Sequence, residues 1–248
     1  MKILKTLASC GGIAALALLL TVSCSARVNG TLHQEGSGSI FLRAALEPRM
    51  AALIRSLSRL NNPSAPPKET ILDGRAIGAS ISAAPGVTSA SLGNTNPVTI
   101  EGPIEIGRMD SFLALPGNQG ASRFITYQKA GSGGRFTLRL NRDISPKVMA
   151  LLSPDAADYL SALMAPAATG EALSKTEYLS LVRSVYGRDI AEEIAGARVR
   201  ATVDFPGPIS AIRGGTVSGA SKNRAEFDIP LLDLLVLETE LEYEALWN

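Results

Sequence analysis

A two-residue period of apolar and polar positions predicts a β-hairpin over residues 27–45. The turn lies at residues 36–38, which read Gly-Ser-Gly. The apolar positions are Val28, Gly30 and Leu32 before the turn, and Ile40, Leu42 and Ala44 after it. Because successive side chains on a strand point to opposite faces, this pattern gives each strand one apolar face and one polar face.

The period then changes to three and four residues, which predicts a helix over 47–60. Its apolar stripe consists of Met50, Leu53, Ile54, Leu57 and Leu60. Pro63 follows two asparagines and ends the helix, since proline cannot continue the hydrogen-bond ladder.

A longer helical stretch is predicted over residues 145–195. The Ser-Pro pairs at 145–146 and 153–154 each read as an N-cap followed by proline in the first turn. Ser174 and Glu177 match a capping box, and an apolar stripe follows them as far as Gly187. A last short helix closes the stretch.

Three further regions alternate as strands do. A hairpin is predicted over 124–140, with a flexible turn at 130–134. Strands are predicted at 199–205 and 225–229. A helical turn at 230–236 and a last strand over 237–247 complete the chain.

Residues 61–120 are the part in which a period is hardest to recognise. Their composition is rich in Ser, Ala, Gly and Asn, which predicts an irregular subregion with surface loops. Ile77 and Ile81 stand four apart in a patterned piece at 71–83. A strand pair or one bent strand is indicated around Gly102 and Pro103.

The order of these elements indicates an α+β fold, because strands follow strands and helices follow helices. We expect a single domain over 24–248 with a mainly antiparallel sheet. The N-terminal hairpin, the central hairpin and the C-terminal strands should form this sheet, and the long helical stretch should pack against it. The other face of the sheet should be partly wet.

Residues 1–23 have the three parts of an export signal. Lys2 and Lys5 supply positive charge, residues 13–20 supply an apolar run, and residues 21–24 supply a junction that reads Thr-Val-Ser-Cys. The apolar run is shorter than the ~20 residues that a membrane-spanning helix needs. The junction resembles the lipobox of bacterial lipoproteins, although Thr21 stands where leucine is usual. The resemblance predicts lipid attachment at Cys24.

A lipid on Cys24 would anchor the protein in the bacterial cell envelope. Several acyl chains give a stable anchor, at about 0.8 kcal/mol for each buried methylene. By the same resemblance, Ser25 after the cysteine favours the outer membrane, since aspartate usually marks retention. The alternative is ordinary cleavage after Ala26, which would leave a soluble periplasmic or secreted protein.

Charge and cysteine content exclude several classes of function. Removal of the signal leaves 22 basic and 23 acidic residues, a balance that does not favour nucleic acid as a partner. Cys10 leaves with the signal, so an acylated mature chain has no disulfide and no cysteine ligand for a metal. We therefore expect no cofactor and no metal.

Few residues suit catalysis. His33 is the only histidine and stands near the first turn, where an ordinary polar role is the expected one. Trp247 stands on the apolar side of the last strand, where core packing is expected. The sequence contains no Gly-x-Ser-x-Gly motif to supply a nucleophile.

A row of acidic residues alternates along the last strand: Glu238, Glu240, Glu242 and Glu244. Such a row allows a calcium site or a carboxylate pair for acid–base chemistry. Residues two apart on a strand lie about 6–7 Å apart, which favours a solvated stripe over a cage. We expect cross-strand pairing with one of two arginine pairs, Arg198 and Arg200 or Arg135 and Arg139.

Three stretches together resemble bacterial lipoproteins of the LppM type. They are residues 36–42 (Gly-Ser-Gly-Ser-Ile-Phe-Leu), residues 203–209 (Val-Asp-Phe-Pro-Gly-Pro-Ile) and the polar strand after the Gly-Gly turn at 214–215. The resemblance implies an envelope-exposed α+β domain without enzymatic residues, with a lipid or glycolipid as a ligand to consider. It supplies no binding residues.

We therefore expect a non-enzymatic, membrane-anchored envelope lipoprotein that binds a hydrophobic ligand, such as a lipid or glycolipid, or a protein partner. An apolar cleft between the sheet and its helices is the expected ligand site. The alternative is a structural or assembly scaffold that docks other envelope components by a sheet edge or a helix face. A hydrolase that uses carboxylates is a third hypothesis. The sequence does not indicate an oligomeric state.

Overall fold

The computed structural model describes residues 25–61, 70–114, 124–143 and 160–248. Cys24 and the two Ser-Pro pairs at 145–146 and 153–154 lie outside these ranges. Within them, no helix combines the length and the apolar character that crossing a membrane requires.

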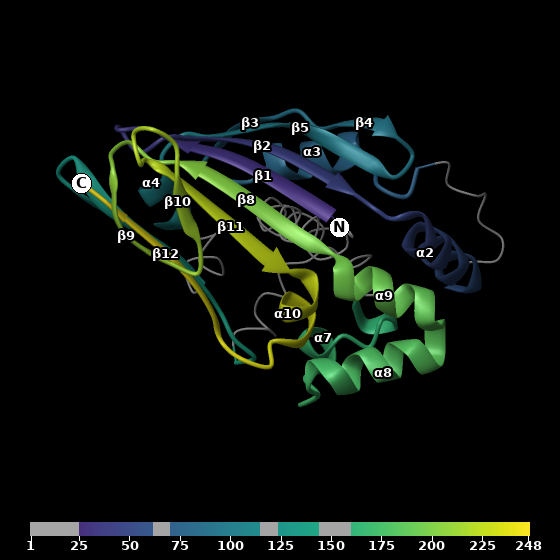
Figure 1. Ribbon diagram of the computed structural model, residues 1–248. Helices are drawn as coiled ribbons and strands as arrows, with labels where there is room; N and C mark the ends of the chain where they lie inside the picture. The colour runs from purple at the N-terminus through teal and green to yellow at the C-terminus, as the bar shows by residue number, and fades with distance from the viewer. Residues whose placement is uncertain (1–24, 62–69, 115–123, 144–159) are drawn as a thin grey trace, which may run out of the picture.

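Eight strands form a large sheet (Figure 1). Their order in space is β10 (Thr216–Ser218), β11 (Arg224–Pro230), β8 (Arg198–Asp204), β1 (Ser25–Leu32), β2 (Gly38–Ala45), β5 (Thr99–Ile106) and β3 (Val87–Ala90), and β4 (Gly93–Asn96) also pairs with β5. Strands β1 and β8 run parallel, and the other pairs are antiparallel. The predicted N-terminal hairpin is β1 and β2, at the centre of this sheet.

Four strands form a second, smaller sheet. Their order is β6 (Ile125–Ala130), β7 (Gly133–Leu140), β12 (Leu241–Trp247) and β9 (Ile209–Arg213), and all three pairs are antiparallel. The predicted central hairpin is β6 and β7, which takes the last strand of the chain as its neighbour.

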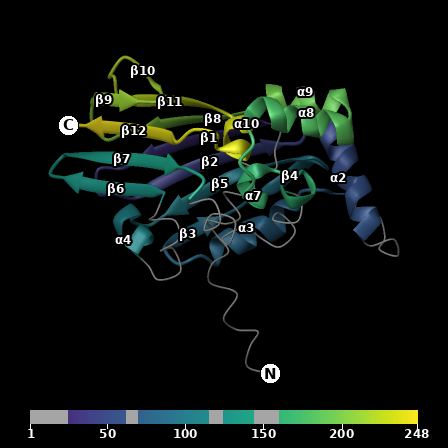
Figure 2. The same ribbon diagram turned by 90° about the horizontal axis from the view of Figure 1, so that it is seen from below.

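Two groups of elements share the inner face of the large sheet (Figure 2). At one end the small sheet packs on it, with a core that includes Phe227, Ile229, Tyr243, Ala245 and Trp247. At the other end lie helices α2 (Pro48–Asn61), α8 (Lys175–Tyr186), α9 (Arg188–Gly196) and α10 (Leu231–Val236). Their core includes Leu42, Ile100, Met50, Val182, Ile194 and Leu235. The outward side chains of β1, β2, β8 and β11, on the other face of this sheet, are exposed or half-buried.

The α+β class and the mainly antiparallel pairing are confirmed. The single predicted sheet is wrong, since the strands are divided between two sheets: the central hairpin β6–β7 pairs with β12 and, through it, with β9, and the N-terminal hairpin pairs with β8 and β5. Helix α10 follows β11 directly and ends at Val236, and its C-cap Leu237 has a φ of 47°, in the left-handed region. The last strand therefore begins at Leu241, four residues later than the sequence predicted, and pairs with β7.

The predicted helix signals are confirmed where the structure describes them. Helix α2 spans 48–61, close to the expected 47–60. The capping box at α8 is complete, since the Ser174 hydroxyl accepts from the Glu177 backbone N–H and the Glu177 carboxylate accepts from the Ser174 N–H. The short helix α7 (Pro166–Thr169) precedes it.

Residues 70–114 are more regular than their composition predicted. They form α3 (Gly74–Ser82), β3, β4, β5 and α4 (Met109–Ala114). The glycines serve close packing here: a Cβ on Gly74 would lie 2.9 Å from the Gly93 carbonyl carbon, and one on Gly78 would lie 3.0 Å from the Leu92 nitrogen. Small residues that resemble a loop composition allow α3 to approach β4 and its flanking backbone.

Candidate functional site

The outer face of the large sheet follows directly from the alternation along its strands. The positions between the core residues point away from both covering layers and are mainly polar or charged. On the central strand β1 they are Arg27, Asn29 and Thr31, while Ala26 and Leu32 are buried. A wide sheet with one dry and one wet face results.

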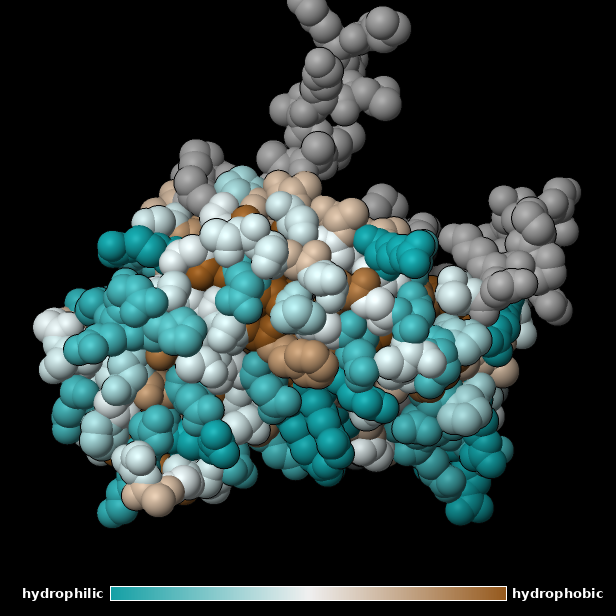
Figure 3. Space-filling model, turned by 90° about the horizontal axis from the view of Figure 1, so that it is seen from above, coloured by the Kyte–Doolittle hydropathy of each residue, from teal (hydrophilic) through white to brown (hydrophobic). Residues whose placement is uncertain are grey.

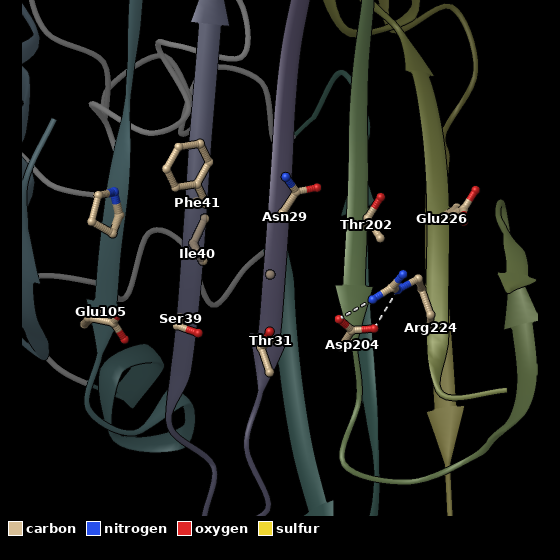
Figure 4. A pocket seen from close by; sticks show the side chains of 12 residues that line it. Asn29, Thr31, Ser39, Ile40, Phe41, Glu105, Thr202, Asp204, Arg224 and Glu226 are labelled. Carbon is tan, nitrogen blue, oxygen red and sulfur yellow. Dashed lines mark hydrogen bonds and ion pairs between the residues drawn. The ribbon is translucent and has the colours of Figure 1, made fainter. Parts of the chain in front are cut away.

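Strand register arranges these outward positions in rows across five strands (Figure 4). One row consists of Pro103, Phe41, Asn29, Thr202 and Glu226. The next row consists of Glu105, Ser39, Thr31, Asp204 and Arg224. The centre of both rows thus carries short hydroxyl and amide side chains, and larger groups stand at both sides.

This arrangement creates a hollow of about 550 Å³ that both rows line. Its floor is formed by Asn29, Thr31, Ser39 and Thr202, because their side chains are short. Figure 3 looks onto the molecule from above, where hydrophobic groups gather near the middle of a largely hydrophilic face. The volume is within the usual range for ligand sites, but the lining is more polar than that of a typical apolar pocket.

Phe41 is the one large apolar side chain among the outward positions of β2. It stands between Ser39 and Arg43 in the polar phase of the strand and is 44% exposed. Pro103 lies directly opposite it on β5 and is also exposed. The two rings give one side of the hollow a small apolar wall.

The opposite side of the hollow is charged. Arg224 donates two hydrogen bonds to Asp204, at 2.7 and 2.9 Å. This fork-to-fork geometry fixes both side chains, although solvent screens the attraction of an exposed pair of this kind. Glu226 stands beside the pair and accepts a hydrogen bond from Ser218. The hydrogen-bonding groups of this wall are therefore fixed in position by their neighbours.

Two members of the predicted acidic row, Glu242 and Glu244, lie on the outer face of the small sheet, away from the hollow. The other two, Glu238 and Glu240, precede β12, and Glu238 accepts a hydrogen bond from the backbone N–H of Lys175 at the start of α8. The partners of Glu242 and Glu244 are Arg139 and Arg135, one of the two expected arginine pairs, and Arg213, which the sequence did not suggest. The two guanidinium groups beside Glu242 hold the pKa of its carboxyl below the ordinary value. Arg198 and Arg200 instead face Asp228 on β11. Cross-strand pairing along a stripe is therefore confirmed for Glu242 and Glu244 and not for the whole predicted row.

The other residues singled out in the sequence are separate from the hollow. His33 is exposed in the turn between β1 and β2. Trp247 is 4% exposed and packs on Phe205 with ring centroids 4.9 Å apart, so its predicted core role is confirmed. In the ranges that the structure describes, no three His, Cys, Asp or Glu residues gather in a way that could hold a metal ion.

The residues that line the hollow were not identified from the sequence. One signal was present: Phe41 occupies a polar-phase position in a strand whose alternation is otherwise regular. The contribution of β5, β8 and β11 depends on register between distant segments. Their spatial order therefore cannot be derived from the alternation.

Comparisons with known proteins add little. No protein-family model matches the chain, and no curated protein matches it. Among solved structures, it is similar to the folded domain of LppM from Mycobacterium tuberculosis, determined by NMR. The identity is 12%, the TM-score is 0.40, and the likeness covers 90% of this chain and 88% of the other. A likeness this distant carries no argument about function.

Proposed function

We propose that this protein is a non-enzymatic lipoprotein of the bacterial envelope, anchored by a lipid on Cys24, which binds the polar part of a lipid or glycolipid on the outer face of its large sheet. The signal and lipobox pattern of residues 1–24 supports the anchor. The hollow beside Phe41 supports the ligand site, and this hollow is the observation that carries the proposal.

The chemistry of the hollow suits an amphiphile better than a wholly apolar molecule. Phe41 and Pro103 offer contact to an apolar surface. The hydroxyls of Thr31, Ser39 and Thr202 can each donate and accept a hydrogen bond, and Asn29 adds an amide. A sugar or a similar polyhydroxylated headgroup offers the matching donors and acceptors. This site lies opposite the sheet–helix interface, where the sequence suggested an apolar cleft.

The non-enzymatic part of the proposal is supported by how the charged groups of the wall are used. Asp204 is engaged by Arg224 through both carboxylate oxygens. A general base needs a carboxylate oxygen that is free to accept a substrate proton, whereas both oxygens of Asp204 already accept hydrogen bonds from one guanidinium. This engagement of Asp204 favours holding a ligand over transforming it.

The scaffold hypothesis remains the alternative, and the strand edges bear on it. The edge strands β10 and β3 of the large sheet have three and four residues. In the small sheet, α4 packs against β6, and β9 contacts β10. Sheet edges that are short, or that are covered by another element, are poor templates for adding a strand from a partner. The strand edges therefore favour docking by another surface over docking by a sheet edge.

Native mass spectrometry tests the ligand proposal. The domain from Ser25 to Asn248, which contains every described element, is purified gently from bacterial cells without its anchor. We expect a reproducible added mass that dissociates as a lipid or glycolipid. Phe41→Ser should reduce the bound fraction several-fold, because it removes the apolar wall. Val217→Ser is the matched control, since Val217 is exposed to 38% on β10 and does not line the hollow.

The outcomes separate the two hypotheses. An added mass that both variants keep equally would place the ligand elsewhere and contradict the site. A clean mass for the unmodified domain would count against ligand carriage in that host. Cross-linking from the outer face to an envelope protein would then support the scaffold.

A further inference from the structure

A row of three arginines crosses the outer face next to the hollow. Register places Arg43 of β2, Arg27 of β1 and Arg200 of β8 directly opposite one another. Neighbouring strands are about 4.8 Å apart, so the three side chains start side by side. Like charges in such positions destabilise a sheet. The requirements of the fold therefore do not explain this arginine row.

The two ends of the arginine row are paired and its centre is not. Arg43 binds Glu101 at 2.9 Å, and Arg200 lies 3.8 Å from Asp228. Arg27 is exposed, and among the described residues no carboxylate lies within 4.0 Å of its guanidinium. The central cation is thus available to an anion from outside the protein.

Charge is also segregated along the whole outer face. The end at which β1 and β8 begin carries four arginines and two carboxylates on outward positions: Arg27, Arg43, Arg198, Arg200, Glu101 and Asp228. The far end carries one arginine and three carboxylates: Arg224, Asp204, Glu105 and Glu226. The face is basic at one end and acidic at the other, although its total charge is balanced.

The basic end is the end nearest the proposed anchor. Arg27 follows Cys24 by three residues, which corresponds to about 10 Å of extended chain. We propose that the arginine row binds the phosphate groups of anionic phospholipids in the membrane that carries the anchor, and so holds the basic end of the outer face against that membrane. The proposal rests on the lipid anchor described above and does not depend on a ligand in the hollow.

Guanidinium groups suit this role, since they bind phosphate oxygens in a two-pronged geometry. Each basic residue near an anionic bilayer strengthens surface binding by about five-fold. The effect should decrease at high salt, because the screening length falls to about 3 Å at 1 M.

A depth measurement on the anchored protein tests the proposal. The full chain is expressed with Ala45→Cys, which adds a thiol on β2 at an outward position two residues beyond Arg43. Protein purified from the membrane is spin-labelled and reconstituted into vesicles of phosphatidylcholine, with or without phosphatidylglycerol. Electron paramagnetic resonance then reports the depth of the label. Palmitate labelling that is lost in Cys24→Ala shows separately that the anchor is present.

We expect the label to lie at headgroup depth only in vesicles that contain phosphatidylglycerol, and to leave the surface at about 1 M salt. Combined Arg27→Gln, Arg43→Gln and Arg200→Gln substitutions should move it into water. The matched control replaces Arg55, Arg75 and Arg183, exposed residues of α2, α3 and α8, with glutamine and should leave the depth unchanged. Thermal unfolding of each variant shows that it is folded.

Two results would overturn the proposal. One is a label depth that does not change with phosphatidylglycerol, or that is the same in the arginine-row variant and in the control variant. In either case palmitate labelling must show that the anchor is intact. The other is binding of soluble glycerol phosphate that depends on the three arginines, together with no arginine-dependent binding to the vesicles. That result would mean that the arginine row binds a free phosphate compound. An absence of palmitate in the unmodified protein would contradict only the anchor. The arginine row would then be tested by comparing vesicle binding of the unmodified protein with that of Arg27→Gln.

Discussion

Glu242 shows how single residues shape the outer surface of the small sheet. Arg139 and Arg213 donate to its two carboxylate oxygens from the strands on either side. Both hydrogen bonds lower the pKa of the carboxyl from its ordinary value of 4.5. A lowered folded-state pKa means that the stabilisation is present above the unfolded value and is lost as the pH falls through the folded value.

Glu242→Gln should therefore change the pH dependence of stability and not only its level. At pH 7 the variant should melt below the unmodified protein, because two guanidinium groups lose their shared anion. The difference should shrink below pH 4.5 as the native carboxyl is protonated. Thermal unfolding across this pH range measures the difference in melting temperature. Glu105→Gln is the control, because Glu105 has no ion pair among the described residues. A melting difference that stays constant at all pH values would contradict this account.

At the scale of elements, the capping box at α8 is a local device whose contribution can be measured. Ser174→Ala removes the hydroxyl that accepts from the Glu177 N–H and should cost about 1 kcal/mol of unfolding free energy. Ser184→Ala, in the same helix, removes only a bond to the Leu181 carbonyl and should have little effect. Urea unfolding followed by circular dichroism compares them. Equal effects of the two substitutions would refute the capping role.

Elements set by local pattern were predictable, and their assembly was not. The hairpins β1–β2 and β6–β7 and the capped helix α8 follow from alternation, turn residues and caps within a few positions. Residues 70–114 were misread because Gly74 and Gly78 serve packing and not flexibility. The parallel pairing of β1 with β8 joins segments that are far apart in the chain, so the rows of the outer face could not be derived.

At the scale of the whole molecule, the proposed binding surface is the outer face of the large sheet, opposite the small sheet and the helices. The hollow and the arginine row occupy neighbouring rows of that face, two residues apart along each strand. An anchor at Cys24 and phosphate contacts at Arg27 would bring the hollow close to the membrane surface. A lipid or glycolipid headgroup could then enter the hollow directly from the bilayer.

Binding of the ligand beside Phe41 is tested by hydroxyl-radical footprinting of the domain. The domain is compared as purified with its added mass and after extraction of that mass. We predict that the Phe41 ring is oxidised several-fold more slowly when the ligand is bound, while Val185 on α8, which is 53% exposed, reacts equally in both states. Protection of residues between the large sheet and its helices, with no change at Phe41, would contradict the claim.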